Sequence, residues 1–113
     1  MFILARARIE NRKLAMAVRA MKVGILQVDL QVGDALTVRD KRRIVKSLRD
    51  RWRHRHNVSV AEVEFLEHPR QARLGVAMVG LERRQLESAL AGLVECLRRE
   101  PRLELLDFQL EII

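Results

Sequence analysis

Residues 37–66 read TVRDKRRIVKSLRDRWRHRHNVSVAEVEFL, and this stretch decides the fold. Its first two thirds predict an α-helix that runs to about residue 56, because apolar side chains recur at i, i+4 and i+8: Ile44, Leu48 and Trp52. Thr37 and Asp40 stand at the two positions of a capping box, so we expect the helix to begin there. The last third is rich in valine and predicts a strand that starts at Val58.

The flanking sequence completes a pattern of four strands and two helices. Strands are expected at 23–30, 58–66, 74–81 and 103–112, and a second helix at 82–99 that Pro101 ends. The resulting order is βαββαβ. We therefore predict an α+β, ferredoxin-like fold, in which two helices pack on one face of a four-stranded antiparallel sheet.

Strand alternation predicts which side chains face the helices. Phe65 and Phe108 are in phase with the expected core residues, whereas the opposite phase presents acids: Asp29, Glu62, Glu64, Asp107 and Glu111. Val58 and Val60 are expected on the outward face, which would permit dimer formation through an edge strand. An acidic open face would repel a nucleic-acid backbone, and the chain has no tyrosine for base stacking.

Length and composition indicate one domain with a basic N-terminal extension. A chain of 113 residues fits a single core, which we place at residues 21–113. Residues 1–20 are expected to be either a helical arm or a solvated, disordered extension. A single cysteine and the lack of a long apolar run favour a cytoplasmic protein that does not enter a membrane.

The formal charge of +7 is concentrated in the first helix. At 100° per residue, five bases fall within an arc of about 80° opposite the apolar face: Arg39, Arg42, Lys46, Arg49 and Arg53. With the neighbouring Arg43, they are the candidate nucleic-acid-binding residues. The stripe is about 21 Å long, which spans several phosphates. The alternative is a solvated helix face, but this face has few acids, and like charges at i, i+4 destabilise a helix.

No constellation of residues indicates catalysis. The chain has no glycine-rich phosphate loop after a strand, and His54, His56 and His68 do not form a recognisable metal-ligand set. Cys96 is expected to be a small buried residue of the second helix. We therefore expect no enzyme activity, no cofactor, no metal and no small-molecule substrate.

Several segments resemble the YlxP-like family, small bacterial proteins of unknown function. The resemblance rests on MKVG at 21–24, KRRIVKSL at 41–48, NVSVAEV at 57–63 and LGVA at 74–77. It implies a ferredoxin-like fold and, because genes of this family often lie near those of translation factors and ribosome-binding factor A, a role around the ribosome. It carries over no catalytic residue.

Two functions remain open at this point. The first is a non-enzymatic RNA- or ribosome-associated accessory protein that binds phosphates through the first helix. The second is a protein–protein interaction module, either a homodimer or an adaptor, that uses the acidic sheet face and the basic helix.

Overall fold

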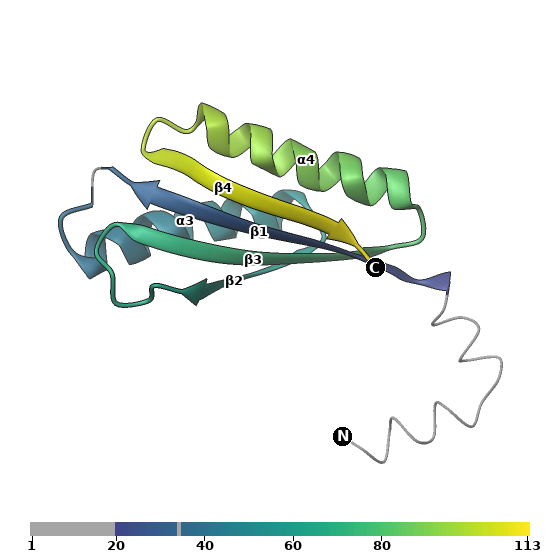
Figure 1. The fold of residues 1–113 in the computed structure, drawn as a ribbon, viewed down its shortest axis with the longest axis horizontal. Helices are drawn as coiled ribbons and strands as arrows, with labels where there is room; N and C mark the ends of the chain where they lie inside the picture. The colour runs from purple at the N-terminus through teal and green to yellow at the C-terminus, as the bar shows by residue number, and fades with distance from the viewer. Residues whose placement is uncertain (1–19, 34) are drawn as a thin grey trace, which may run out of the picture.

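A computed structural model of the protein describes residues 20–33 and 35–113, so the predicted extension lies almost wholly outside the described residues. The elements follow in the order β1 (Lys22–Val32), α3 (Val38–Arg55), β2 (Val58–Glu64), β3 (Gln71–Gly80), α4 (Arg83–Arg99) and β4 (Leu103–Ile112). The strands form one antiparallel sheet in the order β2-β3-β1-β4, and both helices cover the same face (Figure 1). The predicted ferredoxin-like fold is confirmed.

The core lies between this face of the sheet and the two helices. Alternate residues of β1 and β3 are buried against it, from Leu26 to Val32 and from Ala72 to Met78. Trp52 is 3% exposed and belongs to this cluster, as its place on the apolar face of α3 predicts. Among the described residues, no helix is long and apolar enough to cross a membrane.

A register shift in β2 changes the direction of its side chains. The pairing with β3 is interrupted between Glu62 and Glu64. Before the shift, Val58, Val60 and Glu62 lie opposite the helix-facing residues Met78, Val76 and Leu74. The predicted outward position of Val58 and Val60 is therefore wrong, since both belong to the core cluster or pack against it. The predicted outward position of Glu62 is wrong for the same reason.

A second register shift separates Asp29 and Leu30 in the pairing of β1 with β4. Leu30 consequently lies opposite Leu105, and Leu106 is 47% exposed instead of buried. Strict alternation along β4 could not reveal this shift. Phe108, beyond the shift, lies opposite Val28 on the helix side, as predicted.

Phe65 and Cys96 do not lie in the core. Phe65 follows β2 with a φ of 64°, and the Arg73 guanidinium lies 5.3 Å from the centre of its ring. Because Arg73 pairs with Asp29 on the face away from the helices, Phe65 lies on the open side of the sheet. Cys96 is on α4 but is exposed.

The open face is also less acidic than predicted. Asp107 and Glu111 stay on this face because they lie opposite Asp29 and Ile25. The middle strands, however, present Ile25 and Ala77. The carboxylates of Asp29 and Glu64 both accept hydrogen bonds from Arg73.

Candidate nucleic-acid interface

The capping box sets where the basic helix begins. The Asp40 amide donates to Thr37 Oγ1 at 3.1 Å, and Asp40 Oδ2 accepts from the amides of Leu36 and Thr37 at 3.1 and 3.2 Å. These bonds satisfy backbone donors that the first turn leaves unpaired. The Leu36 amide is the main reason that the pKa of Asp40 lies below its usual value, with the Thr37 hydroxyl adding to the effect. The predicted start of the helix is confirmed.

The structure brings three of the six predicted binding residues together around one groove. This groove lies between α3 and the edge strand β2 and has a volume of about 410 Å³. Arg42, Lys46 and Arg49 line its helix side, and the other lining residues are Val45, Ala61, Glu62 and Leu66. The lining combines cations with aliphatic side chains and includes no aromatic ring, so it suits contacts to phosphates rather than base stacking.

The other three predicted residues lie outside this groove. Arg39, Arg43 and Arg53 are exposed on α3, with Arg39 one turn before the groove and Arg53 one turn after it. They extend the positive surface along the helix, but they do not line the groove with the others.

Two of the groove cations have acidic partners. Arg42 Nη2 lies 3.0 Å from Glu67 Oε1, and Lys46 Nζ lies 3.2 Å from Asp50 Oδ2. All four side chains are more than half exposed, so each pair is worth at most about 1 kcal/mol. A phosphate could therefore displace either carboxylate at little cost. The sequence showed Asp50 but not Glu67, because Glu67 reaches the helix from the loop between β2 and β3.

Arg49 carries a polar atom without a partner. Its Nε is buried, and within the described part of the chain no acceptor bonds to it. Buried donors are almost always hydrogen-bonded in folded proteins. Arg49 lines the groove, but this atom has almost no accessible surface, so a ligand in the groove could bond to it only after the side chain moves.

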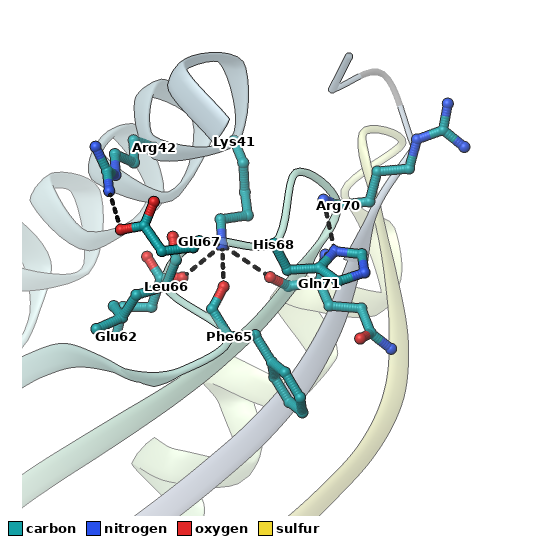
Figure 2. A network of polar contacts seen from close by, with 9 residues as sticks. All are labelled: Lys41, Arg42, Glu62, Phe65, Leu66, Glu67, His68, Arg70 and Gln71. Atoms are coloured by element: carbon teal, nitrogen blue, oxygen red, sulfur yellow. Dashed lines mark hydrogen bonds and ion pairs between the residues drawn. The ribbon is translucent and has the colours of Figure 1, made fainter. Parts of the chain in front are cut away.

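A buried lysine holds the wall of the groove opposite the helix. Lys41 is 0% exposed, and its Nζ donates to the carbonyl oxygens of Phe65 at 2.6 Å and Gln71 at 2.9 Å, with a longer bond of 3.4 Å to Leu66 O (Figure 2). The buried Glu62 Oε2 lies 2.8 Å from the same ammonium and neutralises it.

The loop that Lys41 holds has further internal bonds. His68 Nδ1 accepts from the amides of Arg70 and Gln71 at 3.0 and 2.9 Å, and Figure 2 shows the imidazole beside this backbone. The loop carries Leu66, which lines the groove, and Glu67, which pairs with Arg42. Lys41 is thus a positioning residue for the groove rather than part of its charged surface.

Sequence reasoning missed this role of Lys41, although a signal was present. Lys41, Val45, Leu48 and Trp52 are spaced i, i+4, i+7 and i+11, so the lysine occupies a position on the buried stripe of α3. A lysine in such a position needs buried acceptors.

Comparison with known structures gives similar chains at low sequence identity. Seven chains match, among them the de novo designed protein Foldit4, with 12% sequence identity, a TM-score of 0.44, and coverage of 80% of this chain and 96% of that chain. This likeness carries no argument about function.

Comparison with sequences identifies a family. No curated protein matches the chain. Residues 23–110, which span β1 to β4, match the model of a family described as protein of unknown function (DUF503). The chain therefore belongs to the DUF503 family, a family of proteins of unknown function.

Proposed function

We propose that this protein binds RNA through the groove between α3 and β2, and that it acts as a non-enzymatic accessory protein at the ribosome, in the cytoplasm. The observation that carries the proposal is the clustering of Arg42, Lys46 and Arg49 around one groove. Each of these side chains is a phosphate ligand of the usual kind.

The helix side is favoured over the open face of the sheet as the RNA-binding surface. Proteins of the same βαββαβ order that bind RNA on the sheet stack bases on exposed aromatic rings. Here the two middle strands present no aromatic side chain on that face. The one aromatic ring among its described residues, Phe65, follows the end of β2 and lies against the Arg73 guanidinium. The basic residues lie instead on α3, which packs against the opposite face (Figure 1).

Only the resemblance to the YlxP-like family supports a role at the ribosome. The groove itself has no feature that distinguishes ribosomal RNA from other RNA, because phosphate contacts carry little sequence information.

The dependence of affinity on salt distinguishes groove binding from binding along the whole helix. Three phosphate contacts, from Arg42, Lys46 and Arg49, predict a slope of log K against log salt of about −2.1 for single strands. Five contacts, with Arg39 and Arg53 added, predict about −3.5. Fluorescence titration of a labelled single-stranded RNA between 50 and 300 mM KCl measures this slope.

A charge-reversed pair of variants tests the site. R42E/K46E/R49E reverses the groove, and R83E/R84E/R99E makes the same change in net charge on exposed positions of α4. We expect the groove variant to bind RNA at least about 100-fold more weakly than wild type, and the α4 variant to lose much less. Equal losses would mean that net charge alone drives binding, and an unchanged affinity of the groove variant would overturn the proposal.

Co-sedimentation with ribosomal particles from the source cells tests the second half of the proposal. The wild-type protein should sediment with particles at low salt, and R42E/K46E/R49E should stay in the free fractions. If the protein binds RNA in titration but does not co-sediment, RNA binding through the groove would stand and the association with the ribosome would be refuted.

A further inference from the structure

The open face of the sheet has an ordered arrangement of side chains that the RNA proposal does not use. Strand pairing places its residues in rows across β2, β3, β1 and β4, in that order. One row reads Ser59, Ala77, Ile25, Glu111; the next reads Ala61, Gly75, Gln27, Gln109; and the last reads Glu64, Arg73, Asp29, Asp107. The face thus changes from apolar to charged along the strands.

Its apolar end is uncovered in the described chain. Beyond the first row, Val23 lies opposite Val79 and exchanges two backbone hydrogen bonds with Ile113. Val79 and Ile113 are 48% and 63% exposed, and Ile25 is 39% exposed. A shallow apolar depression of about 300 Å³ adjoins them around Ala61 and Gly75. Contiguous exposed apolar surface of this kind marks an interaction site.

We propose that this face binds a second copy of the same chain, and that a two-fold axis parallel to the strands relates the two copies. Such an axis stacks β1 of each copy on β3 of its partner. The central residues then meet in four pairs: Val23 with Val79, Ile25 with Ala77, Gln27 with Gly75, and Asp29 with Arg73.

Ile25 with Ala77 is complementary in size, Asp29 with Arg73 is complementary in charge, and Val23 with Val79 is an apolar contact. The large side chain of Ile25 lies over the small side chain of Ala77, and Gln27 lies over Gly75, beside the Val63 side chain that packs against this glycine. Asp29 and Arg73 already form an ion pair within each copy and carry opposite charges across the interface. Because a two-fold axis repeats every contact, each complementary pair occurs twice.

A two-fold axis perpendicular to the strands is disfavoured by polarity. A two-fold axis perpendicular to the strands would place the row of Val23 and Val79 over the row of Asp29 and Arg73. At the edges of the favoured arrangement, Asp107 approaches Glu64 of the second copy. This like-charged pair lies at the exposed rim, and Glu64 already accepts a hydrogen bond from Arg73.

The size of the face indicates the class of interface to expect. Four rows about 6.8 Å apart and four strands about 4.8 Å apart cover about 500 Å² in each copy. The two copies together would bury about 1,000 Å², which is at the lower limit for a specific interface and typical of a weak, reversible complex. A dissociation constant in the micromolar range is therefore expected.

Sedimentation equilibrium of the full chain, from about 1 to about 500 µM, measures this association. A77E places a carboxylate against Ile25 of the second copy and should weaken the dimer at least about 100-fold. A91E makes the same substitution on the exposed surface of α4 and should leave the constant within about twofold. A strict monomer throughout this range, or equal effects of the two substitutions, would overturn the proposal and leave the face to another occupant.

An exchange of sizes tests the stacking itself. I25A opens a gap and A77I opposes two large side chains, so each alone should weaken the dimer about 10-fold. The double variant I25A/A77I restores one large and one small partner and should recover wild-type affinity within about threefold. Failure of the double variant to recover, with its fold verified by urea denaturation, would refute the axis.

The dimer does not depend on RNA binding. Arg42, Lys46 and Arg49 lie on the helix side of the sheet, and their groove meets the proposed interface only at Ala61 of the edge strand. R42E/K46E/R49E should therefore weaken RNA binding and leave self-association unchanged. A77E should weaken self-association and leave RNA binding unchanged.

Discussion

Replacing Lys41 by methionine would remove an ammonium that has no contact with solvent. The substitution keeps most of the side-chain volume, so it tests the polar contacts rather than the packing. Two short bonds, to Phe65 O and Gln71 O, would lose their donor, and the Glu62 carboxylate, 11% exposed, would lose its cation.

The expected cost follows from these contacts. Removing one partner of a buried ion pair typically costs about 3–5 kcal/mol, because the remaining charge is left without compensation. Phe65 and Leu66 are 37% and 50% exposed, so water can reach part of the loop after the change. We therefore expect a loss of about 3 kcal/mol in the free energy of unfolding, a large fraction of the total of about 5–15 kcal/mol.

Urea denaturation followed by the fluorescence of Trp52 measures this loss. Trp52 is the only tryptophan and is 3% exposed, so its emission reports on the core. K46M is the matched control, since Lys46 lies on the same helix with 68% of its side chain exposed, and it should change stability by less than about 1 kcal/mol. The double variant K41M/E62L removes the unpaired carboxylate and should recover part of the loss. A K41M protein within about 1 kcal/mol of wild type would refute the reasoning.

Two further predictions concern stability. Hydrogen bonds from Arg102, with a smaller contribution from Arg51, lower the pKa of Glu100 from 4.5 to about 2. The ionised carboxylate therefore stabilises the fold fully above pH 4.5, and this contribution, at most about 3 kcal/mol, is lost as the pH falls toward 2. In acid titration, E100Q should not show this loss of stability. G24A would place a Cβ 2.6 Å from Cδ1 of the buried Leu90, so it should destabilise the protein by about 1–3 kcal/mol in thermal unfolding. G92A, where nothing lies within 4 Å of the new Cβ, should stabilise α4 by up to about 1 kcal/mol. Equal effects of the two substitutions would contradict this packing.

The sequence predicted the fold because its strongest signals are local and consistent. The capping box at Thr37, the apolar stripe of α3 and the strand alternation each point to one arrangement, and the structure has it. The errors within the strands share one cause. Each register shift in the sheet inserts a residue on one strand, so the phase of Val58 or Leu106 cannot be read from alternation within that strand.

The candidate site was predictable in its residues but not in its shape. Helical periodicity places Arg42, Lys46 and Arg49 on one face of α3, whereas the groove also needs Leu66 and Glu67, which a distant loop supplies. That loop depends on Lys41, whose bonds reach residues 24 and 30 positions away in the chain. Pattern analysis of single elements contains no information on contacts of that range.

The two register shifts also bear on how this small sheet avoids aggregation. Both edge strands, β2 and β4, contain a shift, and such irregularities hinder the addition of a strand from another molecule. Charges reinforce this protection, with Lys46 and Arg49 beside β2 and Asp107 and Glu111 on β4. Neutral substitutions in the groove would weaken that protection and would risk insoluble protein. Charge-reversed variants keep the edge of β2 charged and are therefore the better choice for the binding experiments.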